Sequence, residues 1–292
     1  MPSLRHAARI ACSLTACLAL TLLATPASAA STHGGTIVAL NANQSSNWGG
    51  YNQGAIEKGT LFNSIGGQWT VPTATQHTSD QDENSSTWIG IGGGCPESTC
   101  TLPDATLIQE GTEQDVAADG TASYSAWWEL IPGPSITISS LDIHAGDTMS
   151  GSISEIVPNS NVWTLTLQDL TSGQSWSQTV PYTSTHATAE WIEETPLVFG
   201  TGGAGISAMP NLSTVNFDLA TVNGQPAGLD ASEEIQLVQN NTVIATPSAP
   251  DAEADGFNVC TYSSSCGSSG GSASGGGTSK GGHKPHAQSR RR

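Results

Sequence analysis

The chain has 292 residues, with 25 acidic residues against eight lysines and arginines and a formal net charge of −17 at pH 7. Every acidic residue and a single cation, Lys58, lie between residues 31 and 266, so salt bridges cannot stabilise this part. Its carboxylates repel one another at neutral pH and lose their charge in acid, which predicts a protein that works in an acidic environment. The same charge would repel a phosphate backbone, which excludes nucleic acid as a partner.

The first 29 residues have the pattern of a secretory signal peptide. Arg5 and Arg9 precede an apolar run from Ile10 to Leu23, and Ala27-Ser28-Ala29 offers small residues to signal peptidase. The run is too short for a membrane span, and no later stretch has the roughly 18 apolar residues that a spanning helix needs. We therefore expect an extracellular, secreted protein with no membrane span.

Composition divides the rest of the chain into three parts. Residues 30–45 form a short N-terminal segment, residues 46–266 one globular domain, and residues 267–292 a Gly/Ser-rich linker with a basic tail, expected to be disordered. The tail is either without function or a tether that contacts anionic cell-wall polymer electrostatically. The domain is expected to be a monomer.

Four cysteines remain once Cys12 and Cys17 leave with the signal peptide. Three pairings are possible, and the short spacings favour local disulfides, Cys95 with Cys100 and Cys260 with Cys266. A zinc site is the weaker alternative, because neither spacing is Cys-x-x-Cys and no histidine is near either pair. No cofactor or metal is expected.

The domain is predicted to be all-β, because short runs rich in β-branched and aromatic residues alternate with turn residues and no helical periodicity is sustained. The expected strands are Leu61–Val71, Thr87–Ile91, Thr106–Gln114, Ser123–Ile131, Thr148–Ile156, Val162–Leu170, Ser175–Val180, Thr188–Glu194, Thr214–Val222, Glu234–Gln239 and Thr242–Thr246. Many short strands joined by turns indicate a sandwich or barrel.

Common hydrolase signatures are missing between residues 46 and 266: there is no His-Glu-x-x-His, Gly-x-Ser-x-Gly, Asp-Thr-Gly or Asp-Ser-Gly. His33, His77, His144 and His186 lie in polar, loop-like surroundings and are predicted to be solvated surface residues. Carboxylates are the remaining candidates for catalysis.

Strand parity sorts these carboxylates by face. Glu190 and Glu194 share one face of the strand that ends at Glu194, and Glu193 takes the other. Gln109 and Glu110 likewise face opposite ways. Glu129 follows two tryptophans, and we expect desolvation to raise its pKa. By itself each of these residues is more often a surface group than a catalytic one.

A series of ordered motifs carries a more specific signal. They are Ser46-Asn47-Trp48-Gly49-Gly50, Trp69-Thr70-Val71-Pro72, Thr87-Trp88-Ile89-Gly90-Ile91, Leu107-Ile108-Gln109-Glu110-Gly111, Tyr124-Ser125-Ala126-Trp127-Trp128-Glu129, Gly146-Asp147, Leu170-Thr171-Ser172-Gly173-Gln174 and Ala189-Glu190-Trp191-Ile192-Glu193-Glu194. In this order and spacing the chain resembles the eqolisins, or glutamic peptidases, from about residue 45 to at least residue 195.

The resemblance implies a concanavalin A/lectin-like β-sandwich of two antiparallel, roughly seven-stranded sheets, with a catalytic pair on the concave face. By motif that pair is Gln109 and Glu194. Trp88, Trp127 and Glu129 match substrate-binding residues beside it. The chain departs from the family at Gly92 and Thr195, where the family has acidic residues, and only a short segment precedes Trp48 where fungal relatives have a long propeptide.

The implied function is a secreted, acid-active, pepstatin-insensitive endopeptidase that acts on proteins and peptides. Glu194 would be the general base for a catalytic water, and Gln109 would stabilise the oxyanion. Tryptophans and glutamates on strands also suit a glycoside hydrolase or carbohydrate-binding β-sandwich, which is the alternative. An inactive relative that serves as a binding module is a third possibility.

Overall fold

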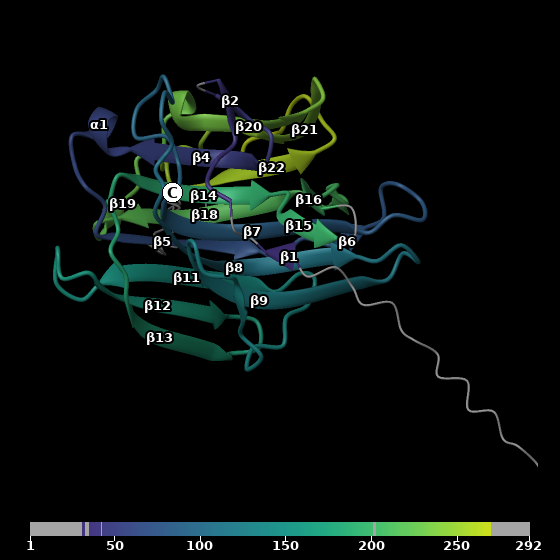
Figure 1. Ribbon diagram of the computed structural model, residues 1–292, viewed down its shortest axis with the longest axis horizontal. Helices are drawn as coiled ribbons and strands as arrows, with labels where there is room; N and C mark the ends of the chain where they lie inside the picture. The colour runs from purple at the N-terminus through teal and green to yellow at the C-terminus, as the bar shows by residue number, and fades with distance from the viewer. Residues whose placement is uncertain (1–30, 33–34, 42, 201–202, 270–292) are drawn as a thin grey trace, which may run out of the picture.

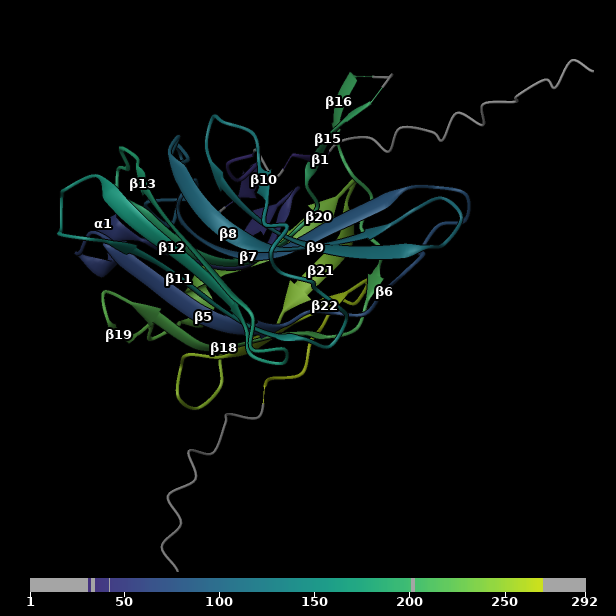
Figure 2. The same ribbon diagram turned by 90° about the horizontal axis from the view of Figure 1, so that it is seen from below.

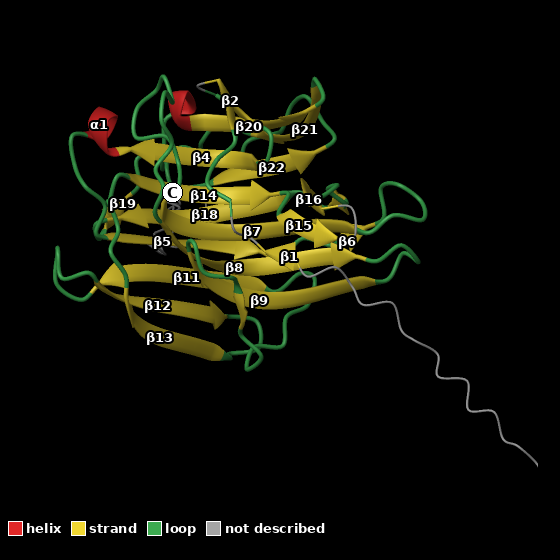
Figure 3. Ribbon diagram, in the orientation of Figure 1, coloured by secondary structure: helices red, strands yellow, loops and turns green. Residues whose placement is uncertain are grey.

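The computed structural model describes residues 31–32, 35–41, 43–200 and 203–269. The predicted signal peptide and the basic end of the tail lie outside the described residues, as does His33. Strands make up nearly all of the regular structure, as Figure 3 shows. The helices are a short α1, Ala55–Lys58, and a 3₁₀ turn, η1, Ala231–Glu233. Neither is long enough to cross a membrane, and the described residues hold no other helix that could.

Each strand range predicted from the sequence is a strand in the structure, although several ends are shifted. These strands are β5 Ser64–Thr70, β7 Glu83–Gly92, β8 Leu107–Val116, β9 Ala122–Leu130, β11 Thr148–Glu155, β12 Val162–Asp169, β13 Ser175–Pro181, β14 Thr188–Glu194, β18 Val215–Val222, β20 Glu234–Gln239 and β21 Thr242–Pro247. Because a strand alternates its side chains between two faces, the parity assignments made from the sequence carry over to these strands.

Other strands were not predicted. They are β4 Trp48–Gly54 and β22 Phe257–Thr261, together with the short strands β1 Ser31–Thr32, β2 Ala39–Asn41, β3 Gln44–Ser45, β6 Ala74–Thr75, β10 Ile136–Thr137, β15 Leu197–Gly200, β16 Gly203–Ile206, β17 Asn211–Leu212 and β19 Gln225–Pro226. The sequence of β4 is rich in glycine and all of its residues are buried, so it lacks the alternation that marks a half-exposed strand.

The strands form two curved layers, seen edge-on in Figure 2. One layer, which we call the site sheet, has the order β10-β9-β8-β7-β14-β4, and the second sheet has the order β13-β12-β11-β5-β18-β22-β21. The expectation of two separate sheets is wrong in one respect. The first half of β20 pairs with β4 and its second half with β21, so the layers are hydrogen-bonded into one assembly.

Large aromatic side chains fill the space between the layers. Trp69, Trp191 and Phe217 are each at most 1% exposed there. The indole nitrogens remain hydrogen-bonded across the core: Trp191 Nε1 donates to Gly66 O over 3.0 Å and Trp69 Nε1 to Thr112 Oγ1 over 3.0 Å. Burying an aromatic of this size contributes about 2–3 kcal/mol when its polar atom keeps a partner.

Two glutamates of the site sheet also point into this core. Glu110 Oε1 accepts from Ser152 N of the second sheet at 2.8 Å, and Glu193 Oε2 accepts from Thr87 Oγ1 at 2.6 Å. Burial raises the pKa of Glu110 well above its usual range and raises the pKa of Glu193 to about 8. Both carboxyls are therefore neutral in acid and become costly buried charges as the pH rises.

The covalent and ionic cross-links agree with the sequence. Disulfides join Cys95 to Cys100 and Cys260 to Cys266, with Cα–Cα distances of 4.9 and 5.4 Å, so the zinc alternative is wrong. Lys58 Nζ lies 2.5 Å from Glu233 Oε1, and among the described residues this is the one ion pair formed by a lysine or arginine.

One histidine prediction is wrong. His186 is 6% exposed, and its Nε2 lies 3.1 Å from Glu155 Oε2. The Glu155 carboxylate also accepts from the amides of Asn159 and Asn161 in the turn after β11, so it links this turn to the loop that carries His186. Burial alone would raise the pKa of Glu155, but these hydrogen bonds together lower it. His144 is exposed as expected, and His77 stacks on Tyr262 with ring centroids 3.6 Å apart.

The buried carboxyls predict how stability depends on pH. A carboxyl whose pKa is raised on folding stabilises the protein below its unfolded pKa, and that stability is lost as the pH rises towards the folded pKa. For Glu193 the window runs from about 4.3, the ordinary glutamate value, to about 8. We expect the melting temperature, followed by circular dichroism, to fall across this window, and to fall less steeply in Glu193→Gln.

Salt separates this effect from repulsion between surface carboxylates. At 1 M salt surface charges are screened within about 3 Å, so the slope that remains belongs to the buried groups. The exposed Glu253 provides the matched control, since Glu253→Gln should leave the high-salt slope as it is in the parent. If Glu193→Gln and the parent had the same slope at 1 M salt, the buried carboxyl would not be its cause.

Candidate active site

Strand register brings all five predicted site residues to one face of the site sheet. β14 lies between β4 and β7, β7 pairs with β8, and β8 pairs with β9. This outer face, turned away from the second sheet, carries Glu190, Ile192 and Glu194 of β14, Trp88 of β7, Gln109 of β8, and Trp127 and Glu129 of β9. All of these side chains are at most 1% exposed.

Parity separates them from their sequence neighbours as predicted. Glu110 and Glu193 point into the core between the sheets, where they accept the hydrogen bonds described above. No register shift interrupts β14 against either neighbour, so Glu193 and Glu194 stay on opposite faces.

Gln109 and Glu129 are directly opposite each other on β8 and β9. Gln109 Nε2 donates to Glu129 Oε2 over 2.8 Å, which fixes the orientation of the amide. Burial raises the pKa of Glu129 to about 7, and the bond from Gln109 opposes the rise. At acid pH Glu129 is therefore a neutral carboxylic acid that positions Gln109 without adding negative charge to the site.

Glu194 is held by an indole. Trp88 Nε1 donates to Glu194 Oε2 over 2.8 Å, and Trp48 packs edge-on against Trp88 with ring centroids 4.9 Å apart. Burial raises the pKa of Glu194 well above the usual range, the Trp88 hydrogen bond opposes this, and the charge of Glu129 adds to it. Glu194 Oε1 has no hydrogen-bond partner among the described residues.

Trp127 supports the same region from β9. Its Nε1 donates to Ser86 Oγ over 3.1 Å, and Ser86 is directly opposite Glu194 in the register of β7 and β14. The indoles of Trp88 and Trp127 thus form an apolar floor between Gln109 and Glu194 while their nitrogens are bonded to polar groups.

Sequence reasoning placed Glu190 on the same face as Glu194 but did not relate it to Gln109. Glu190 is directly opposite Gly90 of β7, and Gly90 is directly opposite Gln109 of β8. In the register of the sheet, Glu190 is therefore closer to Gln109 than Glu194 is. Its carboxyl lies against Gly94 and Asn52, however, and neither oxygen makes a hydrogen bond within the described part of the chain. Burial raises its pKa well above the usual range. A general base needs hydrogen-bond donors that stabilise its negative charge. The Trp88 indole donates to Glu194, whereas no indole donates to Glu190, so Glu194 is the better candidate for the base.

The loop after β7 explains one departure from the family pattern. Gly92 has φ +95°, and a Cβ atom there would lie 2.1 Å from Thr106 O. The aspartate that the family carries at this position would therefore both strain the backbone and collide with a carbonyl.

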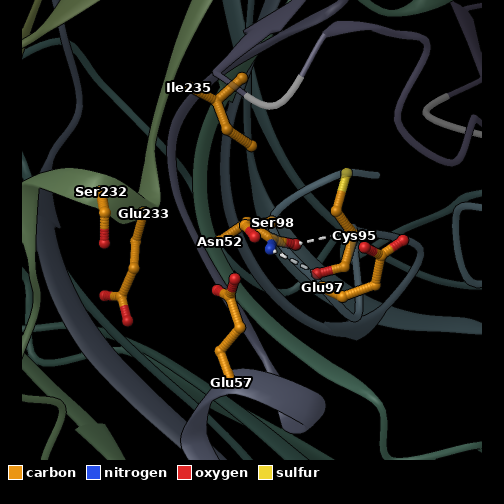
Figure 4. Close-up of a pocket in the computed structure, with 8 residues that line it drawn as sticks. All are labelled: Asn52, Glu57, Cys95, Glu97, Ser98, Ser232, Glu233 and Ile235. Atoms are coloured by element: carbon orange, nitrogen blue, oxygen red, sulfur yellow. Dashed lines mark hydrogen bonds between the residues drawn. The ribbon is translucent and has the colours of Figure 1, made fainter. Parts of the chain in front are cut away.

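Other polar sites lie elsewhere. A pocket drawn in Figure 4 is lined by Asn52, Glu57, Cys95, Glu97, Ser98, Ser232, Glu233 and Ile235, and contains none of the predicted site residues. There Asn52 exchanges two hydrogen bonds of 2.9 Å with the backbone of Cys95, which secures the disulfide loop to β4. Asp218, Asp251 and Asp255 place ligand atoms within 4.8 Å of one another; this acidic cluster is likewise separate from the site.

A carboxyl and an amide that share one face of an antiparallel sheet, steadied by tryptophans, are the parts of a hydrolase that works through water and hydrogen bonds. The chain belongs to the Peptidase A4 family, whose model matches residues 46–259. It is a glutamic-type endopeptidase.

Two curated relatives are similar over most of their length. Scytalidopepsin B of Scytalidium lignicola is 29% identical over 227 residues, which cover 74% of this chain and 78% of the relative. Aspergillopepsin-2 of Aspergillus niger is 26% identical over 231 residues, covering 71% and 76%.

Solved structures agree in fold. Scytalido-glutamic peptidase with a transition-state analogue inhibitor superposes with a TM-score of 0.58 at 23% identity, over 74% of this chain and 98% of that one. SCP-B, an eqolisin in complex with the tripeptide Ala-Ile-His, gives a TM-score of 0.55 at 23% identity over the same shares. The all-β expectation and the resemblance to eqolisins are confirmed, and the glycoside hydrolase alternative is not retained.

The Gly92 loop yields a stability prediction. Gly92→Asp should destabilise the protein by about 2 kcal/mol or more, since it adds a backbone clash to the cost of a positive φ. Gly146 is a matched control, because it has φ +89° and a Cβ atom added there would meet nothing within 4 Å, so Gly146→Asp should show the φ cost alone. Chemical unfolding at acid pH measures both, and equal losses would contradict the steric explanation.

Proposed function

We propose that the protein is a secreted, acid-active endopeptidase in which Glu194 is the general base and Gln109 stabilises the oxyanion. The observation that supports this is the convergence of a hydrogen-bonded carboxyl and a fixed amide on one face of the site sheet, with the Trp88 indole bonded to the carboxyl. The family assignment independently supports peptide-bond hydrolysis.

In the proposed reaction the Glu194 carboxylate takes a proton from a water molecule, and the resulting hydroxide attacks the carbonyl carbon of the scissile peptide bond. The Gln109 side-chain amide, which Glu129 holds in place, donates a hydrogen bond to the developing oxyanion. Collapse of the tetrahedral intermediate breaks the C–N bond. Glu194, now protonated, delivers its proton to the leaving nitrogen.

A neutral amide suits this chemistry in acid, because its donor strength does not change with pH as that of a titrating group would. Glu129, neutral below its pKa of about 7, keeps Gln109 in place without repelling Glu194 at working pH. The apolar floor of Trp88 and Trp127 would lie beneath the bound peptide. The scheme assigns no step to a metal ion, a cofactor, a thiol or a histidine.

Peptide binding by a relative supports the same function, since SCP-B is solved with the tripeptide Ala-Ile-His. Pepstatin is not expected to inhibit, because the catalytic pair is a glutamate and a glutamine rather than two aspartates. Export fits the predicted signal peptide and the two disulfides, which persist in oxidising compartments. We also infer that the protein acts as a monomer and that its basic tail contacts cell-wall polymer.

Variants of the catalytic pair test the assignment. Gln109→Ala and Glu194→Gln should each lower the hydrolysis of denatured protein at acid pH, with pepstatin present, by about 100-fold or more. Glu190→Gln is the matched control: it lies on the same strand and face but near Gly94, so it should keep most of the parent's activity. The assignment is wrong if either member of the pair can be replaced without loss in a folded protein, or if Glu190→Gln is the inactive variant.

Trp88→Phe tests how the base is kept ionised. Loss of the indole donor should raise the pKa of Glu194 further, so the acidic limb of the pH–kcat profile should move to higher pH by about one unit. Trp127→Phe is the control, because it makes the same substitution on the same face. It removes a hydrogen bond to the Ser86 hydroxyl rather than one to a carboxyl. It can lower the rate, yet it should leave the acidic limb in place. An unshifted limb in Trp88→Phe would contradict the role given to the indole.

A further inference from the structure

A tyrosine in the loop that leads into β14 reaches the start of β8. Tyr182 directly follows β13, and residues 182–187 join that strand to β14, which ends at Glu194. Figure 1 shows β13 at the lower edge of the assembly and β14 near its centre, so this loop crosses from the second sheet to the site sheet. On its way the Tyr182 side chain contacts the first residue of β8, two positions before Gln109.

The hydroxyl of Tyr182 occupies one place in the hydrogen-bond ladder between β8 and β9. Two residues that form a hydrogen-bonded antiparallel pair normally exchange two backbone bonds. At the end of this ladder Ile131 N donates to Leu107 O over 2.9 Å, which is the first of the two. In place of the second, Leu107 N donates to Tyr182 Oη over 2.7 Å, and Tyr182 Oη donates to Ile131 O over 3.0 Å. One hydroxyl oxygen therefore separates these two backbone groups.

The bridged position lies close to the pair that holds the proposed oxyanion donor. Strand side chains alternate, so Leu107 shares a face with Gln109, and Ile131 shares it with Glu129. One pair of residues separates the two positions along the ladder. Because both strands are continuous between them, the spacing that the hydroxyl imposes at the end of the ladder affects the spacing at Gln109 and Glu129. These two side chains are joined over 2.8 Å.

Hydrogen bonds on both sides of the loop fix the position of the hydroxyl. On the second sheet, Trp163 Nε1 donates to Tyr182 O over 2.9 Å. Beside the start of β8, Thr185 N donates to Thr106 Oγ1 over 3.2 Å, and the Thr185 hydroxyl donates to the Asp104 carboxylate. The loop therefore binds the segment before β8 as well as the first residue of that strand.

The hydroxyl stays protonated wherever the protein is expected to work. Burial raises the pKa of Tyr182 to about 12, the bond from Leu107 N opposes the rise, and the charges of Asp104 and Glu129 add to it. A protonated hydroxyl can accept from one backbone group and donate to the other at the same time. Phenylalanine at this position would keep the aromatic ring and bind neither group.

We propose that Tyr182 is a positioning residue for the oxyanion donor: its hydroxyl sets the spacing of β8 and β9 at which Glu129 holds Gln109. In this proposal Tyr182 does not contact the substrate and acts through the Gln109 amide. The inference rests on the proposed function, because it explains how the amide assigned to the oxyanion is kept in place.

Tyr182→Phe in the full chain tests the proposal. Without the hydroxyl, β8 and β9 should change their spacing, and kcat on a peptide should fall by about tenfold, the factor that corresponds to one hydrogen bond of ordinary strength, with little change in KM. The pKa of Glu129 should rise above its value of about 7, because the Gln109 bond that opposes the effect of burial is weakened. Carbon-13 NMR of protein labelled at the glutamate carboxyls measures this pKa, and Glu129→Gln identifies the signal.

Tyr124→Phe is the matched control. Tyr124 is also on the site sheet, near the start of β9, and its hydroxyl accepts from a backbone amide, that of Ala74, over 3.1 Å. That bond lies outside the ladder between β8 and β9, so the control should keep the kcat and the Glu129 pKa of the parent. A merely structural role for Tyr182 would lower the melting temperature without moving the Glu129 pKa. That result would overturn the proposal, whether or not kcat falls.

A second variant covers the case in which Tyr182→Phe does not fold. Thr185→Val removes the hydroxyl that binds the loop to Asp104 and keeps the shape of the side chain. It should lower kcat and raise the Glu129 pKa by smaller amounts, because the loop that carries Tyr182 is then less firmly held. A folded Thr185→Val protein in which neither quantity moves would count against the proposal.

The Gln109→Ala background separates this inference from the proposed function. There Tyr182→Phe should no longer move the Glu129 pKa, since the amide donor is absent; an equal shift in both backgrounds would overturn the positioning role. If Gln109→Ala keeps the activity of the parent, the catalytic assignment is wrong, and the NMR measurement still decides whether Tyr182 positions the amide. If Gln109→Ala is inactive and Tyr182→Phe matches the parent in kcat and in the Glu129 pKa, the function is retained and the positioning role is wrong.

Discussion

The structure depends on how buried carboxyl groups are accommodated in a domain that has almost no cations. Six glutamates with no exposed surface lie on or beside the central strands: Glu83, Glu110, Glu129, Glu190, Glu193 and Glu194. The folded domain's one lysine is engaged with Glu233, so it neutralises none of them. Hydroxyl, amide and indole donors stabilise most of them, and Glu110, Glu129, Glu190, Glu193 and Glu194 also have pKa values raised by burial, so acid favours their neutral form. Acid would therefore favour the fold as well as the proposed chemistry.

The two-residue period of the strands divides these carboxyls by role. On the inner face Glu110 and Glu193 bond to Ser152 and Thr87 and belong to the packing between the sheets. One residue away on each strand, Gln109 and Glu194 face outward and belong to the site. A shift of one residue in either strand would exchange the structural acids with the proposed catalytic pair, so the buried aromatic core that fixes the register also fixes the candidate site.

Much of this follows from the sequence, because alternation and motif order are local signals. They identified β8 and β14, the opposite facing of Glu193 and Glu194, and the raised pKa of Glu129 from its tryptophan neighbours. What they missed depends on partners distant in sequence. β4 is buried on both faces and rich in glycine, so its sequence shows no alternation of apolar and polar residues. His186 is buried because its ring contacts Glu155, which is distant in sequence. Glu190 is aligned with Gln109 across the sheet only because β7 pairs between their two strands. The division of β20 between two layers is likewise set by its neighbours rather than by its own residues.

Glu194 presents a conflict between its surroundings and the role proposed for it. A fully buried carboxyl is held neutral, and a neutral carboxyl cannot take a proton from water in the first step. A hydrogen-bond donor to the carboxylate reduces this conflict. The Trp88 indole belongs to β7 and donates to Glu194, so it favours the ionised form that the proposed first step needs. The proposed base therefore depends on β7 as much as on its own strand, β14.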